Sequence, residues 1–143
     1  NMYNMVMLGG FAGYTKTGEV EKYEAIKTSA FWLDIASNGK KVAPGLFIGY
    51  TKNDGTDKNG LAAGETVKYY GRGFNTAGTK VVDNVLRVSG RVDFKQNKFR
   101  ISPELEYTGA TWGTVNTNGN GTADLLQKDV KNFRAMISCA YTF

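Results

Sequence analysis

Few residues in this chain are of types that carry out covalent or acid–base chemistry. Its 143 residues include no His and one Cys, Cys139. Imidazole bases, His-ligated metals, internal disulfides and Cys-x-x-Cys redox motifs are therefore excluded. Glu104 and Glu106 stand two positions apart, which on a strand places both carboxylates on one face, as a paired general acid and base would need. Such neighbours are more often a solvated pair facing Arg partners, so we predict no catalytic residue, no metal site, no cofactor and no enzymatic activity.

The positive charge is spread along the chain. The sequence has 18 Lys and Arg against 13 Asp and Glu, a net charge of +5, which permits nucleic acid or anionic lipid as a partner. The basic residues run from Lys16 to Arg134 with acids between them, and no run of five like charges occurs. We therefore predict no nucleic-acid-binding surface. A hydrophobic fraction of 41% with 22% charged residues indicates a folded chain, and the length suits a single domain.

The charged residues alternate with apolar ones, which is the period of a β-strand. The segment 85–95 carries apolar residues or Gly at even positions and mostly charged residues at odd positions, and the segments 99–108 and 131–143 repeat the alternation. The sequence predicts an all-β, antiparallel, up-and-down fold with strands at about 2–14, 26–37, 40–52, 84–95, 98–112 and 130–143. The long connections, at about 15–25, 53–83 and 113–129, are rich in Asn, Gly and Thr, as solvated loops are.

Two short turns fix the expected register. A two-residue turn at Gln96-Asn97 would pair Phe94 with Phe99 and Arg87 with Glu106, placing opposite charges across from each other. Asn38-Gly39 fits a type I′ turn that pairs Ile35 with Val42. In an up-and-down sheet, all short turns then lie at one end and all long loops at the other.

Alternation by itself fits both a soluble barrel with an apolar interior and a membrane barrel with an apolar exterior. The apolar spans, such as 86–94 and 99–107, cover about nine residues, which is the length that a tilted strand needs to cross an outer membrane. Aromatic residues also gather at both ends of the apolar face, as in interfacial girdles. Phe94, Phe99, Tyr141 and Phe143 lie toward the short turns, and Tyr50, Tyr107 and Phe133 toward the long loops. These features favour the membrane barrel.

The last strand, 133–143, resembles the C-terminal signature of Gram-negative outer-membrane β-barrels. It ends in Phe143, with Tyr141 two positions before it and Ile137 and Phe133 at further alternate positions. The resemblance implies an outer-membrane location, contact with outer-membrane lipid and lipopolysaccharide, and these four residues as the signal read by the barrel-insertion machinery. Within that class the chain is most similar to porins, including the DcaP-like and Bacteroidota trimeric porins, which implies a homo-oligomer, namely a trimer.

The number of strands departs from this family. Six strands are predicted, whereas bacterial single-chain barrels have at least about eight. Either the chain is the C-terminal portion of a longer barrel, which the start at Asn1 without a signal peptide favours, or several chains complete one barrel.

The polar face then becomes the candidate lining of a pore. Its charged members are Asp34, Arg87, Arg91, Asp93, Lys95, Arg100, Glu104, Glu106 and Arg134. Five are basic and four acidic, so a mild preference for anions is expected. The alternative is that the pairs only hold neighbouring strands in register. Tyr69, Tyr70, Arg72 and Phe74, in loop 53–83, would form a constriction or an exposed outer loop.

The function that these features predict is passive diffusion of small hydrophilic solutes and ions through a water-filled outer-membrane channel. Three alternatives stay open. The chain could belong to a plugged receptor or transporter barrel, or to a structural or adhesive barrel that acts through its loops. A soluble β-barrel binding protein is the remaining alternative.

Overall fold

The computed structural model describes residues 9–143, except for the side chains of residues 127 and 128. These residues form seven strands and no helix. The strands are β1 (Gly9–Lys16), β2 (Lys22–Ala36), β3 (Val42–Gly55), β4 (Glu65–Arg72), β5 (Lys80–Gln96), β6 (Phe99–Val115) and β7 (Ala123–Tyr141). No helix that could span a membrane occurs among the described residues.

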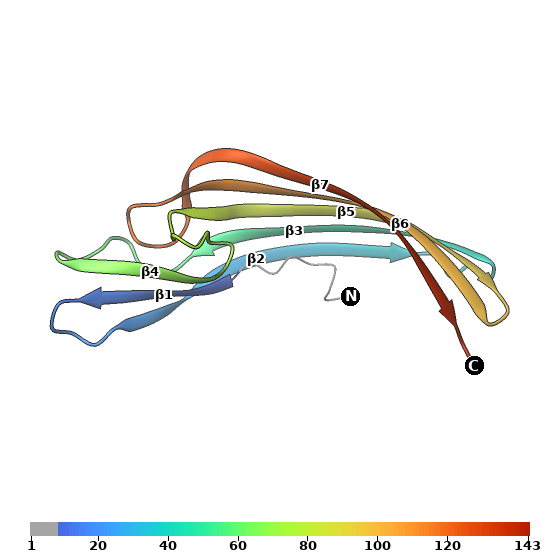
Figure 1. Ribbon diagram of the computed structural model, residues 1–143, viewed down its shortest axis with the longest axis horizontal. Coiled ribbons are helices and arrows are strands. Elements are labelled where there is room, and N and C mark those ends of the chain that lie inside the picture. Colours follow the sequence, from blue (N-terminus) through green and yellow to red (C-terminus); the bar gives the residue numbers. More distant parts are fainter. Residues whose placement is uncertain (1–8) are drawn as a thin grey trace. The chain divides into compact units, whose positions relative to one another are not determined.

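The seven strands form one antiparallel sheet in the order β4-β1-β2-β3-β5-β6-β7 (Figure 1). The predicted all-β antiparallel class is therefore confirmed. Six of the strands follow one another across the sheet as an up-and-down meander, and β4 is the exception. The sheet has two edges, β4 and β7, so it does not close into a barrel among the described residues.

The prediction of a loop over 53–83 was wrong, because this segment contains β4. Glu65–Arg72 pairs antiparallel with β1 (Figure 1). In this register Tyr70 stands opposite Phe11. Thr66, Val67, Tyr69 and Tyr70 are residues that favour strands, but the Gly and Asn residues around them hide this signal. Of the predicted strand 2–14, residues 2–8 lie outside the described residues, and the rest belongs to β1.

The other long connections are shorter than predicted. The chain passes from β1 to β2 through residues 17–21 rather than 15–25, and from β6 to β7 through residues 116–122 rather than 113–129. The strands continue through polar residues that the alternation of charge and hydrophobicity does not mark. For example, the Thr111 hydroxyl on β6 donates a hydrogen bond to the Asp129 carboxylate on β7 at 3.0 Å.

The tight turn predicted at Asn38-Gly39 does not form. Neither residue has the positive φ of a type I′ turn, and the connection runs from 37 to 41. The Ser37 N–H donates to the Pro44 carbonyl at 2.9 Å. Pro44 has no N–H and cannot donate a hydrogen bond to the neighbouring strand. Because it lies next to the loop in this register, the missing hydrogen bond does not interrupt the rest of the ladder. Gly39 is needed for another reason, since a Cβ there would lie 1.8 Å from the Val42 carbonyl oxygen.

The turn between β5 and β6 lies one residue later than predicted. It consists of Asn97 and Lys98, and Asn97 has a φ of 53°, a left-handed conformation that Asn tolerates. With Gln96 and Phe99 flanking the turn, Arg87 stands opposite Thr108 rather than opposite Glu106. The Arg87 Nε donates to the Thr108 hydroxyl at 3.1 Å, in agreement with this register.

The chain divides into two compact units. Among the described residues, unit 1 contains 9–30, 51–85 and 110–130, and unit 2 contains 31–50, 86–109 and 131–143. Unit 1 has an apolar core in two clusters, one around Ala12, Tyr14 and Ile26 and the other around Val82 and Val85. In unit 2 many large apolar side chains are exposed, as described next.

Candidate functional site

The two faces of the sheet in unit 2 differ in chemistry and in exposure. Leu105 is 55% exposed, while its neighbour Glu106, on the opposite face of β6, is 5% exposed. On β5 the small polar Ser89 is 3% exposed and the aromatic Phe94 is 49% exposed. On β5 and β6 the apolar face is thus the more exposed one, which is unusual for a water-soluble sheet. The charged face is not uniformly buried, because Arg100 and Arg134 are exposed, and on β3 it also carries the buried Ala43 and Phe47.

The apolar outer face of unit 2 extends over five strands. Its exposed members are Phe31, Leu33, Ile35, Val42, Leu46, Tyr50, Leu86, Phe94, Phe99, Ile101, Leu105, Phe133, Ile137 and Tyr141. On β3, β5, β6 and β7 the apolar positions cover 42–50, 86–94, 99–107 and 133–141, nine residues on each strand. No layer of protein covers this face among the described residues.

All nine residues predicted to line a pore lie in unit 2, and an ion-paired cluster forms among them. Glu106 Oε2 accepts a hydrogen bond from the Arg134 guanidinium at 3.1 Å, and Arg87 Nε lies 3.7 Å from the same oxygen. The Glu106 side chain is 6% exposed, so its charge is held between two cations from the neighbouring strands. The predicted ion pair of Arg87 with Glu106 is present, but it runs diagonally between β5 and β6.

A second ion pair on this face spans an intervening strand. Arg91 on β5 lies 3.7 Å from the Asp34 carboxylate on β2, although β3 separates the two strands. Gly45 on β3 allows this contact. A Cβ at position 45 would lie 3.1 to 3.3 Å from three atoms of the Arg91 side chain. The missing side chain at Gly45 therefore leaves room for Arg91 to reach Asp34.

The remaining predicted lining residues are not joined into these pairs. Asp93 and Arg100 make no ion pair in the described part of the chain. Lys95 donates to the Gly39 carbonyl at 3.4 Å. One carboxylate oxygen of Glu104 is buried and has no hydrogen-bond partner among the residues that the structure describes, and the same is true of the Ser102 hydroxyl. Buried polar atoms of this kind are usually hydrogen-bonded to a water molecule.

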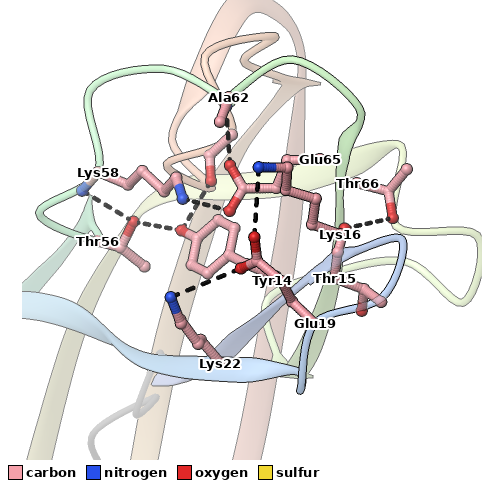
Figure 2. Close-up of polar contacts among 11 residues, drawn as sticks. Tyr14, Thr15, Lys16, Glu19, Lys22, Thr56, Lys58, Ala62, Glu65 and Thr66 are labelled. Carbon is pink, nitrogen blue, oxygen red and sulfur yellow. Dashed lines mark hydrogen bonds and ion pairs between the residues drawn. The ribbon is translucent and has the colours of Figure 1, made fainter.

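Unit 1 contains a polar cluster that the sequence did not reveal (Figure 2). The Tyr14 hydroxyl lies 2.8 Å from the Thr56 hydroxyl and donates to the Gly119 carbonyl at 2.9 Å. Lys58 Nζ stands 4.2 Å from the centre of the Tyr14 ring, a cation–π contact, and donates to Glu65 Oε1 at 2.6 Å. Glu65 Oε2 accepts the Ala62 N–H at 2.8 Å. The cluster ties β1, the start of β4 and two loops together.

Electrostatics in this cluster follow from its contacts. The hydrogen bond from Lys58, followed by that from the Ala62 N–H, lowers the pKa of Glu65 below its ordinary value. Burial raises the pKa of Tyr14, and the hydrogen bond with Thr56 only partly offsets this effect. The cluster thus holds a carboxylate, an ammonium and a neutral phenol, which is an arrangement that stabilises loops rather than one that transfers protons at neutral pH.

The four residues predicted to form a constriction or an outer loop do not all lie together. Three of them, Tyr69, Tyr70 and Arg72, belong to β4, and Phe74 follows this strand. Tyr69 stacks on Phe74, with ring centres 4.9 Å apart, and belongs to the core of unit 1. Tyr70 points to the other face, where it stacks on the exposed Phe11 at 4.9 Å. Phe11 also contacts Tyr23 edge to face at 5.6 Å. Arg72 ends β4, opposite Gly9. The prediction of a loop here was wrong, and whether any of these side chains narrows a pore stays a prediction.

No group of three or more Cys, Asp or Glu side chains among the described residues is arranged to hold a metal ion. Cys139 is exposed on β7. No known protein family, curated protein or solved structure matches the chain. The functional argument therefore rests on the residues and geometry of the chain itself.

Proposed function

We propose that this chain forms part of the wall of an outer-membrane porin, a water-filled β-barrel for passive diffusion of small hydrophilic solutes and ions. The observation that carries the proposal is the exposed apolar face of unit 2. Exposed apolar side chains on five strands are unfavourable in water and favourable against hydrocarbon. A lumen filled with water would, in turn, solvate the charged face.

The dimensions of the apolar face support a membrane location. A membrane-spanning β-strand needs about 9 to 11 residues, and four strands of unit 2 carry nine-residue apolar spans. Aromatic side chains stand at both ends of these spans, as at Phe94 and Phe99 on one end and Tyr50 on the other, each exposed. Tyr and Trp favour the membrane–water boundary, where one part of the ring is apolar and the other is hydrated.

The open sheet sets a further requirement for a barrel. β4 and β7 are edge strands, and unpaired backbone groups cannot face hydrocarbon, so the sheet must be completed by further strands. These strands come either from a longer chain or from other copies of this one. A homo-oligomer, of which a trimer is one form, is part of this proposal.

The C-terminal residues support the same interpretation. Phe133, Ile137, Tyr141 and Phe143 are all exposed, and the Tyr141 and Phe143 rings contact each other edge to face at 5.4 Å. An exposed apolar row on an edge strand is available to the barrel-insertion machinery before the barrel closes. Outer-membrane lipid and lipopolysaccharide are the expected partners afterwards.

Labelling of Cys139 tests the membrane location. The proposal places Cys139 on the lipid-facing side of β7 and Ser138 on the lumen side. In protein reconstituted in vesicles, a charged thiol reagent that does not enter lipid should leave Cys139 unlabelled and should label the Cys139→Ser, Ser138→Cys variant. Both should react in urea. Equal labelling of the two positions in vesicles would contradict the proposal and favour a water-soluble sheet.

Channel activity is tested separately by conductance in a planar bilayer. A porin gives steps of current that scale with salt concentration. A protein that passes the labelling test but shows no conductance would be a plugged transporter barrel or an adhesive barrel instead. The passive channel needs no catalytic residue and no cofactor, and this absence is part of the proposal.

A further inference from the structure

One groove in unit 2 joins the apolar outer face to a cluster of cations. It encloses about 710 Å³ beside the turn Asn97-Lys98. Its apolar wall is formed by Val42, Phe94, Phe99 and Ile101, and its polar end by Lys40, Lys41 and Lys95. Each of the four apolar side chains is more than a third exposed. The groove is therefore amphipathic, with a hydrocarbon-like wall and a positively charged end.

The charge of this groove is uncompensated. No Asp or Glu lines it, and no ion pair of Lys40, Lys41 or Lys95 with a carboxylate occurs among the described residues. Lys40 and Lys41 are exposed, and Lys95 donates to the Gly39 carbonyl at 3.4 Å. Lys41 is held close to β5, because its carbonyl accepts the Lys95 N–H at 2.8 Å.

From this geometry we infer that the groove binds an anionic phospholipid. The phosphate lies at Lys40 and Lys41, and an acyl chain lies along Val42, Phe94, Phe99 and Ile101. A free anion would bind the lysines but leave the apolar wall exposed to water. A neutral lipid would cover the apolar wall but leave the lysines without an anionic partner. An anionic lipid matches both parts. Basic residues beside a membrane surface attract anionic headgroups, which gives the groove a lipid preference as well as a place in the membrane.

This inference rests on the proposed function, and its test uses the same reconstituted protein. Spin-labelled phosphatidylglycerol and spin-labelled phosphatidylcholine are compared in phosphatidylcholine vesicles by the fraction of each lipid that the protein immobilises. We expect wild type to favour phosphatidylglycerol by about fivefold for each lysine near the headgroup, and so on the order of 25-fold for Lys40 and Lys41 together. The Lys40→Gln, Lys41→Gln variant should associate about equally with the two lipids.

A matched control removes the same charge elsewhere. Lys68 and Lys80 are exposed lysines of unit 1, and the Lys68→Gln, Lys80→Gln variant should keep the wild-type preference. Equal association of both lipids with wild type, or an unchanged preference in the Lys40→Gln, Lys41→Gln variant, would overturn the inference. Loss of the preference on adding millimolar inorganic phosphate or glycerol phosphate would also overturn it, because the groove would then be a site for free anions.

The labelling of Cys139 distinguishes the two failures. If Cys139 is protected in vesicles and the lipid preference is missing, the membrane location stands and the lipid site is wrong. If Cys139 is labelled in vesicles, the proposed function itself fails, and the lipid inference fails with it.

Discussion

Two tyrosines of unit 1 share one apolar cluster but differ at their hydroxyl groups. Tyr14 is 2% exposed, and its hydroxyl is hydrogen-bonded to Thr56 and Gly119. The Tyr69 hydroxyl is also buried and makes no hydrogen bond of full geometry, although the Gly121 backbone lies close enough to offset slightly the rise in its pKa that burial causes. The same residue type thus stabilises the fold at one position and carries a hydroxyl without a hydrogen bond of full geometry at the other.

Replacing each tyrosine by Phe should separate these effects. Tyr14→Phe leaves the Gly119 carbonyl without its donor, so we expect the free energy of unfolding to fall by about 1 to 3 kcal/mol. Tyr69→Phe removes a hydroxyl that has no hydrogen bond of full geometry, so the loss of stability should be smaller than in Tyr14→Phe. Urea unfolding in detergent, followed by circular dichroism, measures both. An equal loss in the two variants would show that the hydrogen bonds of Tyr14 contribute little.

High pH should affect stability through Tyr69. Burial, and then the neighbouring Tyr14, raise the pKa of Tyr69 to about 12, above the ordinary value of about 10 in an unfolded chain. Between these values the unfolded state loses a proton that the folded state keeps, so stability falls as the pH rises from about 10 to about 12. Tyr69→Phe should weaken this alkaline loss, measured by unfolding at a series of pH values. A pH profile identical to wild type would contradict the assignment.

At the scale of strands, local alternation could be predicted from the sequence and long-range pairing could not. The apolar and charged faces of β5, β6 and β7 follow from side chains that alternate along one strand. The pairing of β4 with β1 brings together residues that are far apart in sequence, such as Tyr70 and Phe11, 59 positions apart. The connection at Asn38-Gly39 is widened by Ser37 and Pro44, whose hydrogen bond lies outside the dipeptide that signals a tight turn.

The candidate site was predicted in part, for the same reason. The nine charged residues share one face because they alternate with apolar residues, a local property of each strand. The contact of Arg91 with Asp34 depends instead on Gly45, which lies on the strand between them and leaves room because it has no side chain. The Tyr14 cluster joins residues from β1, β4 and two loops, and no spacing in the sequence links them.

The strands β5, β6 and β7 are joined on their polar face through Glu106. Glu106→Gln would remove the charge between Arg87 and Arg134, and we expect a loss of about 1 to 3 kcal/mol in the free energy of unfolding. Glu104→Gln is the matched control, because one Glu104 oxygen already lacks a hydrogen-bond partner, and its effect should be smaller. The midpoint of urea unfolding in detergent gives the comparison. A larger effect at Glu104 would show that Glu106 does not join these strands.

At the scale of the whole molecule, the two units differ in how much apolar surface they expose. Both units bury apolar and polar side chains, such as Val81 and Asn53 in unit 1 and Phe47 and Glu106 in unit 2. Most of the exposed large apolar side chains, however, lie in unit 2. In the membrane barrel that we propose, unit 1 would meet water and the exposed apolar face of unit 2 would meet hydrocarbon.

The sign of the charge on the polar face should set the ion preference of the proposed channel. This face carries five basic and four acidic residues, so Arg100→Glu would change its net charge from +1 to −1. Arg100 makes no ion pair in the part of the chain that the structure describes, so the substitution should leave the cross-strand pairs intact. The reversal potential in a KCl gradient should then shift toward that of a cation-selective channel. Lys68→Glu makes the same charge change in unit 1 and should leave the potential unchanged. Equal reversal potentials in wild type and Arg100→Glu would mean that the charged face only holds strands in register.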